Sequence, residues 1–215
     1  MADSKQVPLD AEAAAKAAFA SVQDQPFPDD IFTVPELRWA VIGCGVIANQ
    51  MAQSLALAGR KLAGVANRTL SKAQAFAEQY GVEKVYETVE DLYADPDIDA
   101  VYITTPHNTH ITYLRAALAA GKHVLCEKAI TLNSAELDEA RAIADEHNVV
   151  LMDATTVFHM PLYQELRRRM DAGDFGRMNL AQLNFGSYKE YGDLTNRFYN
   201  RSLAGGAMLD IGVYA

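Results

Sequence analysis

The chain has 215 residues, of which 50% are hydrophobic, and its formal net charge at pH 7 is −9. This length and apolar content can bury a sizeable core, and the 22% of charged residues does not indicate a disordered chain. The acidic balance disfavours a nucleic-acid partner, which needs a basic surface, and no apolar run is long enough to span a bilayer.

The first 35 residues are predicted to form an N-terminal arm and linker. Asp10 can cap a short Ala-rich helix, and the proline-containing stretch 25–36 is typical of an extended linker. The N-terminus lacks the apolar core of a signal peptide. Cys44 and Cys126 lie in apolar runs without metal-ligand spacing, which favours a cytoplasmic protein in a reducing compartment.

From residue 36 to residue 157, apolar runs typical of strands alternate with segments of helical periodicity. The predicted strands lie at 36–45, 61–67, 84–87, 99–106, 123–128 and 149–157. The predicted helices lie at 46–59, 69–81, 88–96, 110–121 and 134–148. Gly81 is placed to end the second helix, and Thr88 and Asp91 have capping-box spacing. This alternation predicts α/β architecture with a doubly wound parallel sheet of the Rossmann type.

The stretch GCGVIA, residues 43–48, fits the pattern G-x-G-x-x-A directly between the first strand and the first helix. The first glycine allows a tight turn, the second lets the backbone approach a pyrophosphate, and the alanine allows close helix–strand packing. The helix N-terminus attracts the anion. The predicted cofactor contacts here are Gly43, Gly45, Val46, Ile47 and Ala48.

The end of the second strand indicates which dinucleotide is bound. An Asp or Glu at this place usually bonds the ribose 2′-hydroxyl, but this chain has Asn67 and Arg68 there. Nothing acidic would repel a 2′-phosphate, and Arg68 could pair with one. The sequence therefore predicts NADP(H) in preference to NAD(H), with a solvated loop role for Arg68 as the alternative.

Polar side chains follow the fourth strand, at the sheet edge where ligands bind in such folds. Two histidines lie three residues apart, but no carboxylate or third histidine stands beside them, so a metal is not expected. Lining of the nicotinamide site is the favoured role, and capping of a helix by Asn108 or Thr109 is the alternative. The residues concerned are Thr105, Pro106, His107, Asn108 and His110.

The fifth strand ends in Glu127 and Lys128. A lysine at this edge, beside a bound cofactor, is well placed for proton chemistry or substrate orientation. The alternative is an ordinary salt-bridged lysine after a strand.

Four motifs in register, GCGVIA, TPHNTH, AGKHVLCEKA and GGAMLDIGVY, resemble the Gfo/Idh/MocA oxidoreductase family from about residue 37 onward. The stretches VVLMDATTVF and NRFYNRSLAGGAMLDIGVY are most similar to its dihydrodiol dehydrogenase and glucose–fructose oxidoreductase branch. The resemblance implies an NADP(H)-dependent oxidoreductase that transfers hydride between the nicotinamide and an alcohol or carbonyl of a small molecule. A sugar, a cyclitol and a trans-dihydrodiol all remain open as substrates.

The resemblance also implies a catalytic set, Lys128, Asp210 and Tyr214. Asp210 and Tyr214 are four residues apart, so on a helix they share a face. Tyr214 would exchange the proton of the substrate hydroxyl, Lys128 would favour its phenolate form, and Asp210 would hold Lys128. Ala129 replaces the proline of the family's Glu-Lys-Pro motif, which makes Lys128 less rigidly placed.

Residues 158–215 match the beginning of the family's second, α+β domain. We expect a helix over 161–173, a strand over 177–189 and a helix that starts at 205. The rest of that domain, which often forms the dimer contact, is expected to be missing, so a homo-oligomer is an expectation for the complete protein. A chain ending here would bind NADP(H) but turn over poorly, because chain ends fray.

Two other functions remain open. One is a non-catalytic NADP(H)-binding or sensing module that ends at Ala215, although a sensor has no need of Lys128, Asp210 and Tyr214. The other is an enzyme that reduces a C=C or C=N bond. Tight cofactor binding without turnover would favour the module. A panel of substrates would distinguish an enzyme that acts on alcohols and carbonyls from one that reduces C=C or C=N bonds.

Overall fold

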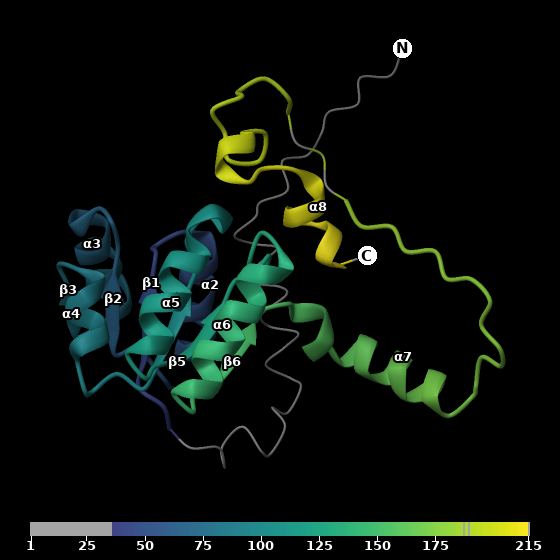
Figure 1. The fold of residues 1–215 in the computed structure, drawn as a ribbon, viewed down its shortest axis with the longest axis horizontal. Coiled ribbons are helices and arrows are strands. Elements are labelled where there is room, and N and C mark those ends of the chain that lie inside the picture. Colours follow the sequence, from purple (N-terminus) through teal and green to yellow (C-terminus); the bar gives the residue numbers. More distant parts are fainter. Residues whose placement is uncertain (1–35, 187, 189, 215) are drawn as a thin grey trace. The chain divides into compact units, whose positions relative to one another are not determined.

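The computed structural model describes residues 36–186, 188 and 190–214. The arm predicted for residues 1–35, with its cap at Asp10, lies outside the described residues. The described part begins with the strand that opens the predicted sheet (Figure 1).

A parallel sheet of six strands, in the order β3-β2-β1-β4-β5-β6, lies among the helices α2–α6 (Figure 1). The strands are β1 Trp39–Ile42, β2 Gly64–Ala66, β3 Lys84–Tyr86, β4 Ala100–Ile103, β5 His123–Cys126 and β6 Leu151–Asp153. Each predicted strand of the region 36–157 is present, and all the pairings are parallel. The doubly wound Rossmann arrangement is confirmed.

Five helices connect the strands, and local signals in the sequence set several of their ends. The helices are α2 Val46–Leu57, α3 Leu70–Tyr80, α4 Val89–Ala94, α5 His110–Ala119 and α6 Ser134–Glu146. The Thr88 side chain accepts a hydrogen bond of 3.1 Å from the Asp91 amide, so the predicted cap is confirmed. Gly81 ends α3 in the left-handed conformation, as expected of a glycine stop.

The core lies on both faces of the sheet, because successive side chains of a strand point to opposite faces. Ala40 and Ile42 of β1 pack in one cluster with residues of α5 and α6, such as Leu114 and Ala140. Val41 packs in the other cluster with residues of α2 and α3. Helices on both faces explain why the central strands are almost continuous apolar runs.

After β6 the chain forms the short helix η3 Thr156–His159 and then α7 Pro161–Asp171. On α7, Glu165 pairs with Arg168 and Arg169, and all three are exposed. These arginines therefore lie on a solvated face of the helix. None of the described helices has the length and apolar character that a membrane span requires.

The strand predicted over 177–189 is wrong for its described residues, which form no regular element. A strand is stable only when a neighbour satisfies its backbone groups. Every strand pairing among the described residues lies within the sheet β1–β6, so this stretch has no partner there. Its alternation of apolar side chains alone does not make a strand.

The helix predicted from residue 205 is also wrong in its continuity. The chain forms η4 Arg201–Leu203, a four-residue α8 Ala207–Asp210, and a 3₁₀ turn η5 Gly212–Tyr214. Ile211, between α8 and η5, leaves helical geometry at φ −125° and ψ −16°. A β-branched residue followed by a glycine has weak helix propensity, and so short a segment gains little from helix propagation.

Gly64 of β2 lies where the sheet leaves no room for a larger side chain. A Cβ at this position would lie 2.6 Å from a ring carbon of Tyr86 and 3.3 Å from the Cβ of Ala40. Tyr86 cannot move away easily, because its hydroxyl donates to Asp95 at 2.6 Å. We expect Gly64→Ala to lower the free energy of unfolding by about 1–3 kcal/mol, as overpacking does.

Urea denaturation measures this change. The matched control is Gly192→Ala, because nothing lies within 4 Å of a Cβ added at Gly192. Equal destabilisation by the two substitutions would contradict the expectation.

Candidate functional site

The site is built at the edge of the sheet where the parallel strands end. Strand order reverses between β1 and β4, and in open α/β sheets a crevice forms outside the carboxyl ends at such a point. The glycine turn follows β1, and the loop that begins at Thr104 follows β4. The Thr104 amide donates to the carbonyl of Ile42 at 3.0 Å, which holds the two segments side by side.

The glycine turn has the shape that a pyrophosphate needs. Gly43 has φ +101°, and a Cβ there would lie 2.7 Å from the Thr104 hydroxyl, so the turn admits only glycine. Gly45 precedes α2, no side chain caps this helix end, and an added Cβ would meet nothing within 4 Å. Val46 is 73% exposed. The amides of the first helical turn are thus not capped by a side chain, and there is open space beside Gly45, so that an anion can bind to this helix end.

At the end of β2, one side chain forms a hydrogen bond within the turn and the next is exposed to solvent. The Asn67 amide donates to the carbonyl of Thr69 at 2.9 Å, so Asn67 shapes the turn before α3. Arg68 is exposed, and the first turn of α3 contains no acidic residue. Burial raises the pKa of the Cys44 thiol to about 11, and the charge of Lys72 opposes that rise.

The loop after β4 brings His107 to the crevice and His110 beneath it. The His110 ring is fully buried, and its nitrogens lie 2.8 Å from the carbonyl oxygen of Thr105 and 2.9 Å from that of Ala129. His110 therefore joins the loop after β4 to the loop after β5 and does not face the crevice. Burial lowers the pKa of His107 and of His110, and the charge of Lys128 adds to the effect at His107.

The remaining polar groups of this loop have different surroundings. Asn108 Oδ1 is buried without a hydrogen-bond partner among the described residues, which leaves an acceptor for a bound group. Thr109 precedes α5, but its side chain makes no capping hydrogen bond to this helix. Across the described ranges, no group of three or more His, Cys, Asp or Glu could hold a metal ion.

The structure brings Lys128, Asp210 and Tyr214 together. The Lys128 ammonium donates to the main-chain carbonyl of Asp210 and to its carboxylate, the latter at 3.1 Å. The two side chains are only 15% and 17% exposed. Lys128 Nζ also lies 5.2 Å from the centre of the Tyr214 ring, so the cation faces the aromatic ring. Beside them, Glu127 accepts a hydrogen bond from the Tyr102 hydroxyl.

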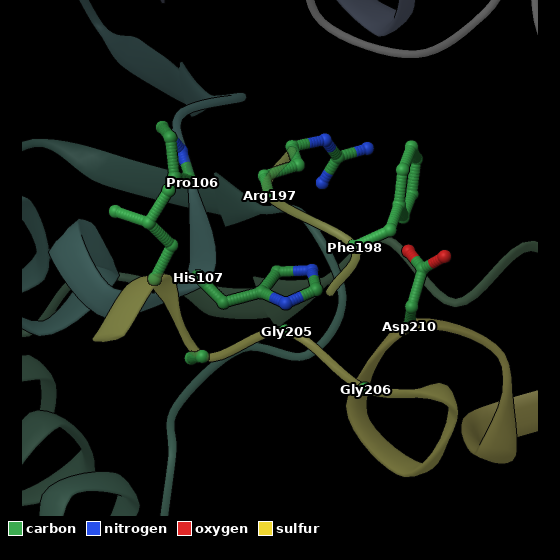
Figure 2. Close-up of a pocket in the computed structure, with 9 residues that line it drawn as sticks. Pro106, His107, Arg197, Phe198, Gly205, Gly206 and Asp210 are labelled. Atoms are coloured by element: carbon green, nitrogen blue, oxygen red, sulfur yellow. The ribbon is translucent and has the colours of Figure 1, made fainter. Parts of the chain in front are cut away.

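A small pocket of about 10 Å³, room for one water molecule, opens beside this group (Figure 2). Figure 2 shows the His107, Arg197 and Asp210 side chains around it. Gly205 lies under the turn that carries Arg197, and a Cβ at Gly205 would lie 2.9 Å from the carbonyl oxygen of Asn200. The glycine pair thus lets this turn approach the start of α8.

Some functional candidates carry no signal in the motifs. Tyr102 lies inside β4 and has the pattern of a core residue, yet its hydroxyl holds Glu127. Burial raises the pKa of Tyr102, and the Glu127 charge adds to the rise, so Tyr102 stays protonated and donates. Asn49, directly after the glycine motif, contacts the turn through its side chain. Only the folded backbone brings these groups to their partners.

Comparison with known proteins assigns the chain to a family. Residues 37–155 match the Gfo/Idh/MocA oxidoreductase family model, described as having an NAD-binding Rossmann fold. Residues 163–215 match the family's C-terminal domain model. The chain belongs to the Gfo/Idh/MocA family, as its motifs predicted.

Curated relatives include trans-1,2-dihydrobenzene-1,2-diol dehydrogenase of Mus musculus, 36% identical over 183 residues, which are 83% of this chain and 54% of that protein. The same enzyme of Homo sapiens is 35% identical over 83% of this chain and 53% of its own length. The chain thus spans about half the length of these relatives. A solved mutant of KijD10, a 3-ketoreductase from Actinomadura kijaniata with NADP and TDP-benzene, has TM-score 0.69 and 31% identity over 84% of this chain and 55% of its own.

The two glycines of the turn are expected to have different roles: Gly43 is needed for packing, and Gly45 is needed for cofactor binding. Gly45→Ala places its methyl group in open space, so we expect an unchanged urea midpoint. That space is where the pyrophosphate would approach, so the dissociation constant for NADPH should rise by about tenfold, or about 1.4 kcal/mol. Gly43→Ala, by contrast, should lower stability because of its clash with Thr104.

Fluorescence titration with NADPH and urea denaturation test both variants. Wild-type affinity in Gly45→Ala would place the pyrophosphate elsewhere.

Proposed function

We propose that the protein is an NADP(H)-dependent oxidoreductase that transfers hydride between the nicotinamide and an alcohol or carbonyl of a small molecule. The observation that carries the proposal is the meeting of Lys128 with Asp210 and Tyr214, across a separation of 82 residues between Lys128 and Asp210. Lys128 belongs to the loop after β5, at the same sheet edge as the glycine turn. The relatives named above, a dehydrogenase and a ketoreductase, support the same reaction class.

The residues at the sheet edge fit the cofactor. The uncapped amides of α2 suit a pyrophosphate, and the buried, unpartnered Asn108 Oδ1 suits a hydrogen-bond donor such as a carboxamide. When bound, the nicotinamide supplies or accepts the hydride. The residues that we propose to contact the cofactor are Gly43, Gly45, Val46, Ile47, Ala48, Asn67, Arg68, Thr105, Pro106, His107, Asn108, Glu127 and Lys128. His110 acts on this set only through the two loops that it joins.

The preference for NADP(H) over NAD(H) rests on charge at the end of β2. Arg68 is exposed there, and the first turn of α3 contains Lys72 and no acidic residue. A carboxylate would bond a ribose 2′-hydroxyl and repel a 2′-phosphate, whereas these cations attract the phosphate.

Titration of the chain with NADPH and NADH tests this preference. We expect NADPH to bind more tightly, and Arg68→Ala to reduce the ratio of the two affinities by at least about tenfold, since hydrogen bonds to charged groups contribute about 1.5–3 kcal/mol. Arg141→Ala, on the exposed surface of α6, is the matched control and should leave the ratio unchanged. Equal affinity for the two cofactors in the wild type would contradict the assignment.

Proton transfer is the task that we assign to Tyr214. Oxidation of an alcohol removes the hydroxyl proton as hydride leaves the carbon, and reduction of a carbonyl returns that proton. Tyr214 exchanges it, and the Lys128 cation, 5.2 Å from the ring centre, stabilises negative charge that develops on the phenol. Asp210 fixes the Lys128 ammonium through the two hydrogen bonds described above.

The role of Tyr214 is tested by Tyr214→Phe, which keeps the ring and its contacts with Lys128 and Phe185. In the complete protein, turnover should fall by at least about 100-fold, the usual contribution of general acid–base catalysis, while the dissociation constant for NADPH changes less than about threefold. The assay follows NADPH oxidation with a panel of sugar, cyclitol and dihydrodiol-derived ketones. Tyr191→Phe, at an exposed tyrosine, is the control. Unchanged turnover in Tyr214→Phe would remove this residue from the acid–base role.

A further inference from the structure

A side-chain network supports the glycine turn from the helix side. Asn49, in the first turns of α2, donates from Nδ2 to the carbonyl oxygen of Gly45 at 2.8 Å, and the same nitrogen lies 3.5 Å from the carbonyl oxygen of Cys44. The Tyr80 hydroxyl, at the end of α3, donates to Asn49 Oδ1 at 2.7 Å. Neither residue belongs to the motif that predicts the cofactor site.

Hydrogen-bonding chemistry fixes the orientation of the Asn49 amide. Backbone carbonyl oxygens only accept, so the group facing Gly45 must be the NH₂ and the group facing Tyr80 must be the oxygen. Gln79 Nε2 donates to the Tyr80 oxygen at 3.1 Å, and Gln53 Nε2 lies 3.4 Å from it. The phenol oxygen therefore accepts from these amides and gives its own proton to Asn49.

Tyr80 itself is held in place. It is partly buried, packs against the core cluster that contains α2 and α3, and its ring centre lies 4.8 Å from that of Phe76. The Asn49 amide is thus anchored to a neighbouring helix as well as to the turn.

The geometry of the peptide bond carries this anchoring to the anion side of the turn. In a planar trans peptide, the carbonyl and the following N–H point in opposite directions. The Gly45 carbonyl accepts from the backbone amide of Asn49 at 3.1 Å as well as from its side chain, and the side chain adds the contact with the Cys44 carbonyl. With both carbonyls held toward α2, the amides of Gly45 and Val46 are directed away from Asn49. Those are amides that a pyrophosphate over the open side of Gly45 can use.

We propose that Asn49, oriented by Tyr80, is a positioning residue that presets the glycine turn for the pyrophosphate. It keeps two carbonyl oxygens, which would repel phosphate, on the far side of the turn. It also fixes two amides before the cofactor arrives, so that binding need not order them. This inference rests on the proposed cofactor site and adds the residues that shape it.

Fluorescence titration of the chain with NADPH at one fixed salt concentration provides the test. Asn49→Ala should raise the dissociation constant by about tenfold, the loss expected for one well-formed hydrogen bond near a charged ligand. Asn49→Asp should raise it at least as much, because a carboxylate has the same shape but cannot donate to the carbonyls and repels the phosphate. Urea denaturation of each variant separates this effect from a loss of folded protein.

Tyr80→Phe tests whether Tyr80 acts through Asn49. It should raise the dissociation constant by about threefold, and the double variant with Asn49→Ala should bind no worse than Asn49→Ala alone, because contacting residues in one network are not additive. Gln74→Ala, at an exposed position of α3 outside this network, is the control and should leave the constant within about twofold.

The outcomes separate this inference from the proposed function. If the wild type binds NADPH and both Asn49 variants bind it equally well while folded, the positioning role is wrong and the cofactor site stands. Additive effects of Tyr80→Phe and Asn49→Ala overturn the part assigned to Tyr80. If the folded wild type does not bind NADPH, the proposed function fails, and the inference fails with it.

Discussion

The close approach of Gly43 to Thr104, where β1 and β4 end together, is the constraint on which the site depends. Its basis is the pairing of β1 with β4, strands that are far apart along the chain and adjacent in the sheet. A side chain at Gly43 would collide with the Thr104 hydroxyl. With glycine there, the turn before α2 and the loop before α5 meet at one edge of the sheet. The backbone of these two segments forms the two sides of the cofactor site that we propose.

The reactive group is assembled across much greater separation in sequence. Lys128 and Asp210 are 82 residues apart, and their contact involves both the carboxylate and the main-chain oxygen of Asp210. Because both side chains are largely buried, removing one partner would leave the other without compensation. The same contact therefore fixes the ammonium and holds the segment that carries Tyr214. A substitution of Lys128 or Asp210 will therefore change both the catalytic activity and the position of the segment that carries Tyr214.

Most of the fold could be predicted because its determinants are local. Apolar runs of strand length, helical periodicity, the cap at Thr88 and the stop at Gly81 each act over a few residues. The parallel order then follows from the alternation of strands and helices. The glycine turn was predictable for the same reason, since its function depends on backbone conformation that the residue type permits.

The rest depends on partners that local sequence does not specify. The stretch 177–186 has strand-like alternation, but no described strand pairs with it. Asp210 and Tyr214 were expected on one continuous helix, and they reach Lys128 although that helix breaks at Ile211. His110 was expected to line the nicotinamide site, and tertiary packing instead buries its ring between two carbonyls. Asn49 and Tyr80 are separated by 31 residues, and only the packing of α2 on α3 makes them neighbours.

The buried ring of His110 has a mechanical consequence. It braces the segment after β4 against the segment after β5, so Thr105 and Ala129 cannot separate without breaking a contact in the interior. His107 lies two residues after Thr105, and Lys128 directly precedes Ala129. The two residues therefore belong to segments that His110 connects. A movement of the segment that carries Asp210 and Tyr214, which contacts Lys128, would by contrast leave the His110 contacts intact.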